Sequence, residues 1–573
     1  MNKKIRQVRC AVMAGLHKWL VLSALLCSCV LQAREACFVA EQAPGDVFRF
    51  QPSAAHEALA EAMPEDAVIN SLRFRRLAVF DESDSRENST IYRWANDFHS
   101  VTREWVLREQ LLVTEGDRYE RRRLEESERI LRQLKFIYDA RVRPWRRCGD
   151  RVDLEIVTRD IWTFLPSVSL GRSGGQNDWS LGFRDSNFLG TGKQVLMEYD
   201  SDDERSGYTL AYTDPALLGS RWRLRARYTD NDDGYDRNLR IERPFFSIYE
   251  NWSAGAEVGE LKLEEKLWSR GDETAEFDHE LDVYRLFGGV AASPEPGRRV
   301  NRWLLGYNYE RHNFDFSDSG LPPAQLPQDR TYSYPWLGYQ SVEDEFAELH
   351  NFDYLGRTED VFVGERYRWS FGYSTEGMDA TRDQIAFEGN YENTLLAEQQ
   401  QLWVIASTLA GYWTLDDESF ENLWWQFESR YHLKHGEQWA FYSGLRLDYT
   451  DGLTADRQLV LGGDNGLRGY DRNYQTGDRS FVLNLEERYY SNWHPFRLVR
   501  VGVAAFVDIG RAWYENRDNG SNGDVLANAG FGLRLNSSRA EKSAVVHVDL
   551  AFPFVRDDDV DDVQLLITVK ERF

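Results

Sequence analysis

Apolar and polar residues alternate with a period of two over most of the chain after Ile161. In the stretch 195–200, Val195, Met197 and Tyr199 alternate with residues of which two are acidic, and in the stretch 222–228 apolar residues alternate with three arginines. A period of two is the strand pattern, and one apolar face opposite one charged face is typical of a transmembrane β-barrel. The pattern therefore predicts an all-β, antiparallel barrel over residues 161–573.

The connections between these runs separate a membrane barrel from a soluble sandwich, which would show the same alternation. Short connections are expected at 190–192, 214–219, 491–496 and 536–542, and longer acidic ones at 200–204, 230–233, 515–524 and 556–562. Short turns on one side and longer loops on the other are what an outer-membrane barrel requires. The acidic loops would then lie at the cell surface, as solvated carboxylates or bridged by divalent cations to lipopolysaccharide.

The number of strands is less clear than their existence. Five strands are predicted near the C-terminus, at 479–491, 499–510, 526–536, 543–553 and 563–573, and about fifteen candidate runs precede them. Either some segments between 270 and 435 are loop hairpins or parts of one long strand, or the barrel is large.

The N-terminal region differs from the rest. Residues 1–33 have a basic start and a short apolar core, which predicts a cleaved secretory signal peptide, and residues 34–67 are irregular. Loss of five cations (Lys3, Lys4, Arg6, Arg9 and Lys18) would change the formal charge from −25 to −30. Such an acidic surface makes nucleic acid an unsuitable partner.

Residues 68–160 predict a small α+β module. Strands are expected at 69–79, 138–143 and 151–158, and helices at 103–112, after Thr102 as N-cap, and at 119–134. Only Cys37 and Cys148 remain after cleavage of the signal peptide, and an oxidising compartment favours their pairing, which one sequence does not establish.

No catalytic, metal or cofactor site is predicted. The histidines, such as His312 and His432, are scattered without metal-ligand spacing, and no Gly-x-Ser-x-Gly motif is present. The protein is not expected to be an enzyme.

A glycine-rich stretch at 461–470 contains one arginine, Arg468, between two long runs of predicted strands. Glycine permits sharp folding of the backbone, and arginine offers five hydrogen-bond donors in a rigid fork. Without further context this is either an exposed hairpin loop or a functional one.

Family resemblance sharpens the interpretation. Residues 68–160, including Leu131 to Ala140, resemble a POTRA domain, and the chain from about residue 68 resembles the BamA/TamA superfamily of outer-membrane insertases and translocators. Three motifs carry the resemblance: Gly182 to Gly192, the loop sequence Leu467-Arg468-Gly469-Tyr470, and Phe506-Val507-Asp508-Ile509-Gly510.

The resemblance implies a POTRA domain in the periplasm and a barrel of the bacterial surface antigen type with about 16 strands. It also implies that the loop Gly466, Leu467, Arg468, Gly469 and Tyr470 folds into the lumen, where Arg468 pairs with Asp508. Glu486 and Glu487 are alternative partners. Phe573 resembles the C-terminal signal that barrel-assembly machinery reads, although Glu571 departs from its usual pattern.

The function implied is assistance with insertion, assembly or translocation of client proteins at the bacterial outer membrane. Clients would bind the open edge of the POTRA sheet by strand addition, and the barrel would contact outer-membrane lipid and lipopolysaccharide. A weak seam is expected between the first strand, 162–171, and the last, 563–573. A passive channel or surface-structural barrel is the alternative.

Overall fold

The structure is a computed structural model, and the chain divides into two compact units. The described residues are 37–40, 47–48, 50, 53–64, 66–202, 204–292, 299–317, 322–323, 326–350, 352, 357–398, 400–515, 523–540, 545–555 and 560–570. The first unit consists of Met1–Arg75, Val113–Leu124 and Arg141–Val157, and the second of Arg76–Leu112, Glu125–Ala140 and Thr158–Phe573. The predicted signal peptide and Phe573 lie outside the described residues.

The region before residue 161 contains four strands and four helices among its described residues. They are β1 (Phe38–Val39), α3 (Ala54–Glu61), β2 (Val68–Leu77), α4 (Thr90–Phe98), α5 (Glu104–Arg108), α6 (Arg121–Gln133), β3 (Ile137–Cys148) and β4 (Arg151–Asp160). The strands form one sheet in the order β1-β3-β4-β2. The order of elements follows the predicted one, with α4 added. That residues 68–160 are a POTRA domain stays a prediction.

One helix of this region is shorter than its sequence predicts. Thr102 was expected to cap a helix over 103–112, but α5 ends at Arg108, and the N-cap position is Arg103. The Thr102 hydroxyl and backbone amide both donate to the buried carboxylate of Asp160, at 2.9 and 2.7 Å. Because the Thr102 hydroxyl is hydrogen-bonded to Asp160, it does not cap the helix, since other side-chain hydrogen bonds of threonine compete with capping.

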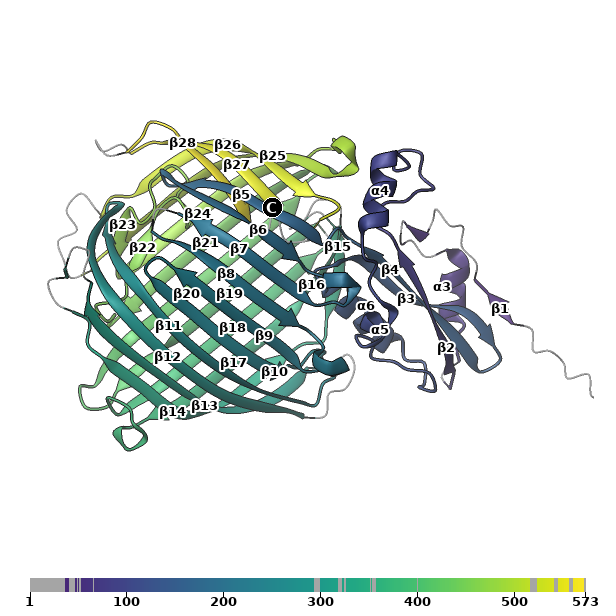
Figure 1. The fold of residues 1–573 in the computed structure, drawn as a ribbon, viewed down its shortest axis with the longest axis horizontal. Helices are drawn as coiled ribbons and strands as arrows, with labels where there is room; N and C mark the ends of the chain where they lie inside the picture. Colours follow the sequence, from purple (N-terminus) through teal and green to yellow (C-terminus); the bar gives the residue numbers. More distant parts are fainter. Residues whose placement is uncertain are drawn as a thin grey trace, which may run out of the picture. The chain divides into compact units, whose positions relative to one another are not determined.

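The second unit holds a closed antiparallel barrel of 20 strands, whose tilted strands lie side by side in Figure 1. The strands before the glycine-rich loop are β5 (Phe164–Ser173), β6 (Gln176–Asp185), β7 (Gln194–Ser201), β8 (Ser206–Asp214), β9 (Arg223–Asn231), β10 (Gly234–Arg243), β11 (Trp252–Ser269), β12 (Asp272–Ala292), β13 (Val300–Phe316), β14 (Arg330–Val342), β17 (Gly364–Ser374), β18 (Gln384–Ala397), β19 (Gln401–Thr414), β20 (Ser419–Lys434) and β21 (Trp439–Asp451). After the loop come β24 (Arg479–Tyr490), β25 (Val499–Trp513), β26 (Leu526–Ser537), β27 (Val545–Pro553) and β28 (Gln564–Lys570).

Among the described residues, two hairpins lie outside the barrel wall, together with four short 3-10 turns. The hairpins are β15 (Phe346–His350) with β16 (Thr358–Phe362), and β22 (Leu459–Leu461) with β23 (Gln475–Gly477). The turns are η1 (Phe188–Gly190), η2 (Leu217–Gly219), η3 (Glu376–Met378) and η4 (Pro495–Arg497).

The expectation of 16 strands is wrong. That number came from the family resemblance, and it required several segments between 270 and 435 to lie outside the wall. Only the short strands β15 and β16 do so among the described residues of that region, whereas β12, β13, β14 and β17 to β20 are all wall strands. Each of these seven strands reaches the length of roughly 9–11 residues that can cross a bilayer, so each can be a full member of the wall.

The wall strands present alternate residues to the inside and the outside. Along β25, Val503 is exposed on the outer face, whereas Phe506 and Asp508 are buried on the inner face. The described helices include none long and apolar enough to cross a membrane.

The closure between the last and first wall strands is short. Among the described residues, β28 and β5 share one register pair, Ile567 with Arg172. The neighbouring pair β27 and β28 is in register from Val545 with Lys570 to Ala551 with Gln564. The described part of the wall is therefore least continuous where the barrel closes.

Candidate functional site in the barrel lumen

The glycine-rich loop is the tip of the β22–β23 hairpin, in the connection between β21 and β24. Its two arms touch closely: a Cβ on Gly462 would lie 2.2 Å from the carbonyl oxygen of Asp471, and one on Gly463 would lie 2.3 Å from that of Tyr470. Only glycine allows such an approach of two backbones. The Asn465 side chain closes the turn by accepting from the Gly462 amide at 2.7 Å.

The tip places Arg468 against the inner faces of β24 and β25. The Arg468 Nε and Nη2 atoms donate to the two carboxylate oxygens of Asp508 at 2.9 and 2.7 Å, and Nη1 donates to Glu486 at 2.7 Å. Arg468 is 4% exposed and Asp508 is fully buried. The parallel hydrogen bonds match the fork of the guanidinium to the carboxylate, which is the strongest geometry for this pair.

Asp508 is held from both sides by side-chain amides. Asn484 donates to it at 2.7 Å and Asn528 at 2.8 Å. The register of the sheet explains this arrangement, since Asn484 on β24 and Asn528 on β26 each pair directly with Asp508 on β25. The neighbouring wall strands therefore orient the Asp508 carboxylate. Asn484 also donates to the carbonyl oxygen of Gly466 in the loop, at 2.8 Å.

The Phe-Val-Asp-Ile-Gly motif of β25 contacts the loop through alternate residues. The Arg468 guanidinium lies over the Phe506 ring, 3.5 Å from its centroid, which is within the range of a cation–π interaction. Gly510 leaves room for the Leu467 side chain, which would be 3.2 Å from an added Cβ. The three alternate residues of the motif thus each contact the loop: Phe506 through its ring, Asp508 through its charge, and Gly510 by leaving room for a loop side chain.

Further charges surround the pair. Arg488 donates to Glu486 at 2.9 Å, Arg534 forms an ion pair with Asp549, and Asp549 lies 3.6 Å from Arg468. Three arginines (Arg468, Arg488 and Arg534) thus meet three carboxylates (Asp508, Glu486 and Asp549). Charges removed from water need such pairing, because an unmatched buried charge is costly.

Tyr470 fixes the loop by a second contact. Its hydroxyl donates to the carbonyl oxygen of Ala527 at 2.9 Å and lies 3.2 Å from that of Val555, and its ring is buried. The ring belongs to a hydrophobic cluster with Leu461, Leu467, Tyr474, Val482, Ala512 and Leu526. The loop is thus held by packing as well as by charge.

The loop also touches strands on both sides of the barrel closure. Gln564 on β28 donates to Asp471 at 3.0 Å. Arg472 lies 3.4 Å from Asp178 on β6, and its backbone amide donates to Gly174, in the β5–β6 turn, at 3.4 Å. One loop therefore connects the last wall strand to the first hairpin.

Of the residues expected at this site, the structure brings together Gly466, Leu467, Arg468, Gly469 and Tyr470 with Asp508 and Glu486. Glu487 lies elsewhere and contacts His435 at 2.8 Å. Asn484 and Asn528 were not anticipated. The period of two along β24 placed Asn484 on the same face as Glu486, but only the register between strands could show that both amides flank Asp508.

Of the other predicted site residues, Phe573 lies outside the described residues. Cys37 and Cys148 form a disulfide in the first unit. Among the described residues, no group of three or more His, Cys, Asp or Glu is arranged to hold a metal ion.

Comparison with known proteins finds a family model that matches part of the chain. Residues 326–573 match the Omp85 superfamily domain, and no curated protein matches the chain. Similar solved structures include BamA from Haemophilus ducreyi lacking POTRA domains 1–3 (14% identity, 88% of this chain and 85% of that chain, TM-score 0.37). CdiB from Acinetobacter baumannii is 12% identical, with 88% of this chain and 74% of that chain covered and a TM-score of 0.40. CdiB from Escherichia coli is 11% identical, with 95% of this chain and 92% of that chain covered and a TM-score of 0.45.

The matched region contains Arg468, Asp508 and the whole lumen network. A closed antiparallel barrel with such a domain is an outer-membrane protein. The chain therefore carries an Omp85 superfamily domain over residues 326–573, which confirms the resemblance to the BamA/TamA superfamily for this part of the chain.

Proposed function

We propose that this protein assists the insertion, assembly or translocation of client proteins at the bacterial outer membrane. The observation that carries the proposal is the Omp85 domain whose lumen loop is held by the Arg468–Asp508 pair. The protein would catalyse no covalent reaction. The free energy would come from the folding of the client and the burial of its apolar surface.

The proposal assigns the loop the role of a latch, defined by Gly466, Leu467, Arg468, Gly469 and Tyr470. Support comes from the contacts of the adjoining residues Asp471 and Arg472 with β28 and the β5–β6 hairpin. In its docked position the loop would hold the two sides of the β5–β28 seam together. Its release would let the seam open toward lipid for a client strand.

The first region of contact for a client would be the N-terminal module, placed in the periplasm. β2 is an edge strand of the four-stranded sheet. The edge is covered at its start, where Val68 forms a bridge with Arg118. An extended client segment would add to an edge of this sheet by strand addition.

The proposal is tested by deleting the gene in the native bacterium and comparing the proteins of the outer membrane and the culture medium. We expect one or a few barrel or secreted proteins to be lost, and the wild-type protein to restore them. An Arg468→Ala variant that still reaches the outer membrane is expected to restore them poorly. An unchanged protein composition would refute the proposal.

A passive channel is the competing function, and electrical recording separates the two. The lumen loop occupies the interior next to β24–β27, so the purified protein should give small and fluctuating conductance in planar bilayers. A large, steady and solute-selective conductance, together with an unchanged protein composition in the deletion strain, would favour the channel.

A further inference from the structure

The helix α4 exposes a continuous apolar face. Ile91, Trp94 and Phe98 are 69%, 61% and 66% exposed, and none of the helix residues is buried. Residues three and four apart lie on the same side of a helix, and the rings of Trp94 and Phe98 are in contact, with centroids 4.5 Å apart. A contiguous exposed face of this kind marks a site of interaction with a protein or a membrane.

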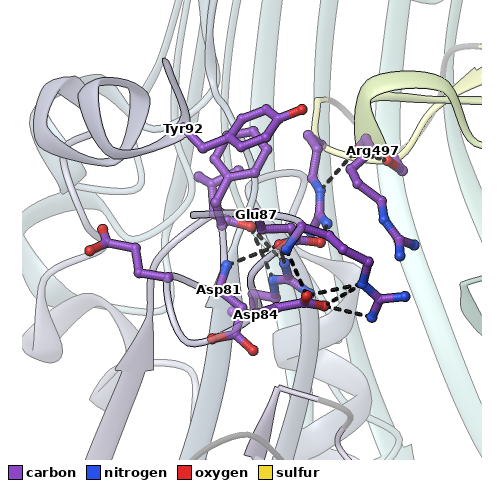
Figure 2. A network of polar contacts seen from close by, with 12 residues as sticks. Asp81, Asp84, Glu87, Tyr92 and Arg497 are labelled. Atoms are coloured by element: carbon purple, nitrogen blue, oxygen red, sulfur yellow. Dashed lines mark hydrogen bonds and ion pairs between the residues drawn. The ribbon is translucent and has the colours of Figure 1, made fainter. Parts of the chain in front are cut away.

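The opposite face of α4 is fixed to the body of the second unit. The Tyr92 ring stacks on Phe80, with centroids 4.6 Å apart, and its hydroxyl donates to the Phe496 carbonyl in the β24–β25 turn at 2.7 Å. The Asn96 side chain makes two hydrogen bonds of 3.0 Å with the backbone of Phe80. Figure 2 shows Tyr92 extending from α4 toward the turn that carries Arg497. The helix is therefore attached by one side, with its apolar side turned away.

The segment before α4 is anchored to the same turn and to the next. Glu87 is buried and forms an ion pair with Arg539 of the β26–β27 turn. Arg539 also donates to the carbonyl oxygens of Val79, at 3.2 Å, and Arg497, at 3.1 Å. Glu87 in addition accepts from the Asp81 amide at 3.0 Å (Figure 2). These contacts fix α4 relative to the ends of β24–β27.

The turns at this end of the barrel carry exposed apolar residues of their own. Leu189, Leu218 and Phe496 each occupy the left-handed backbone region, with φ of 53°, in η1, η2 and η4. Leu218 is 96% exposed and Phe496 is 80% exposed, and Trp493 is exposed beside Phe496. Outer-membrane barrels place apolar and aromatic residues in girdles where the membrane meets water. The three turns thus mark the level of one membrane surface.

The turn that holds α4 adjoins the outer face of the wall. Phe496 and Leu498 in this turn are exposed, as is Val503 on the outer face of β25, and the Tyr92 hydroxyl attaches α4 to the same turn. The outer face of the wall contacts lipid. Among possible occupants of the α4 face, this attachment at the level of one membrane surface favours lipid over a second copy of the chain or a client.

We infer that α4 is an interfacial helix, whose apolar face Ile91, Trp94 and Phe98 inserts into the lipid surface beside the β24–β25 turn. Tryptophan and phenylalanine on one face of a short helix with polar residues elsewhere are typical of helices that lie in the plane of a membrane. Asp97 is exposed at the border of the face, where lipid headgroups would meet it, and Arg93 is exposed on the polar side of the helix. This inference depends on the barrel being in a membrane and does not depend on the proposed client function.

The full mature chain allows a clean labelling experiment, because Cys37 and Cys148 are joined in a disulfide and any introduced cysteine is then the reactive one. A fluorescent label is attached to Trp94→Cys, and in a matched variant to Arg93→Cys, on the polar side of the same helix. Each protein is reconstituted into vesicles of phosphatidylethanolamine and phosphatidylglycerol, with or without brominated acyl chains.

We expect brominated lipid to quench the label at position 94 and iodide in the water to leave it bright, with the reverse at position 93. A label at Ile91→Cys should behave like the one at 94, which guards against local unfolding in a single variant. The inference is overturned if iodide quenches 94 and 93 equally. Shielding of position 94 from both quenchers would also overturn it, since protein would then cover the face.

Discussion

The guanidinium of Arg468 is stabilised by charge, by hydrogen-bond geometry and by an aromatic ring at once. Each of these contributions depends on exclusion of water, because hydrogen bonds and ion pairs strengthen as the surrounding dielectric constant falls. The same burial makes the site sensitive to the loss of either partner. Asp508 retains two amide donors when Arg468 is removed, but no longer has a neutralising charge so near.

A double-mutant cycle on Arg468→Ala and Asp508→Asn tests this coupling. Each single change is expected to destabilise loop docking by roughly 3–5 kcal/mol, the usual result of leaving a buried partner alone. The double variant should lose less than the sum of the two. The measurement is hydrogen exchange of residues 462–474 in detergent micelles.

Arg472→Ala is the matched control for that cycle. Arg472 is in the same loop, but it is only partly buried and lies 3.4 Å from Asp178. Its removal should cost about 1 kcal/mol or less, as is usual for partly exposed pairs. Equal effects of Arg468→Ala and Arg472→Ala would show that the buried pair stabilises loop docking no more than the partly exposed pair does.

At the residue scale, motifs predicted more than composition did. The family resemblance carried by the loop and strand motifs implied that Arg468 lies opposite Asp508, and the structure places the two together. The amides of Asn484 and Asn528 could not be predicted in the same way. They reach Asp508 through the register of three strands, and a shift of one residue would have turned them to the outer face.

The loop as an element depends on glycine at a few positions. Gly466 has φ of 131°, and an added Cβ would lie 2.7 Å from the Val482 side chain. Gly466→Ala is expected to destabilise the docked loop by about 1–3 kcal/mol through strain and crowding. Limited proteolysis should then cut within 462–474 sooner than in the wild type. Gly377→Ala is the control, because its Cβ would meet no atom within 4 Å; equal cleavage of both variants would contradict the account.

The anchoring of the segment before α4 gives a second prediction for an element. Burial lowers the pKa of Arg539, and Glu87 opposes this shift, so the ion pair keeps the guanidinium charged. Arg539→Ala leaves Glu87 buried without its partner and should detach the segment. Hydrogen exchange in α4 is then expected to rise by about tenfold or more, a change of at least about 1.4 kcal/mol in local opening.

Arg497→Ala serves as the comparison, since Arg539 bonds to the Arg497 carbonyl and not to its side chain. It should leave exchange in α4 nearly unchanged. If Arg539→Ala also leaves exchange unchanged, the ion pair does not hold the segment.

Elements were predictable where alternation was long. The five strands after the loop lie where the pattern put them, because each presents a lumen face and a lipid face over its whole length. The helix α4 was not predicted. Its apolar residues face outward, and nine residues of mixed polarity with Asn96 and Asp97 give little helical signal.

At the scale of the whole molecule, the residue pattern and the family resemblance gave different strand numbers. The pattern contained about fifteen candidate runs before the loop, and the structure has the 15 strands β5–β14 and β17–β21 there. The expectation of 16 strands, taken from the family resemblance in place of this count, was wrong. Alternation reports each strand locally, whereas the size of a closed barrel depends on all strands together.

The central claim is that this barrel handles clients through the seam between β5 and β28, and locking that seam tests it most directly. Arg172 and Ile567 are paired across it, so Arg172→Cys with Ile567→Cys should form a disulfide in the oxidising environment of the cell envelope. The background is Cys37→Ser with Cys148→Ser. Val503→Cys with Leu533→Cys, a pair between β25 and β26, is the control.

The measurement is the outer-membrane and secreted protein composition of the deletion strain that carries each variant, with and without a reductant in the medium. The account predicts that the oxidised seam variant fails to restore the missing clients, that reductant rescues it, and that the control pair restores them in both states. Full restoration by a protein whose seam is shown to be cross-linked would contradict the account.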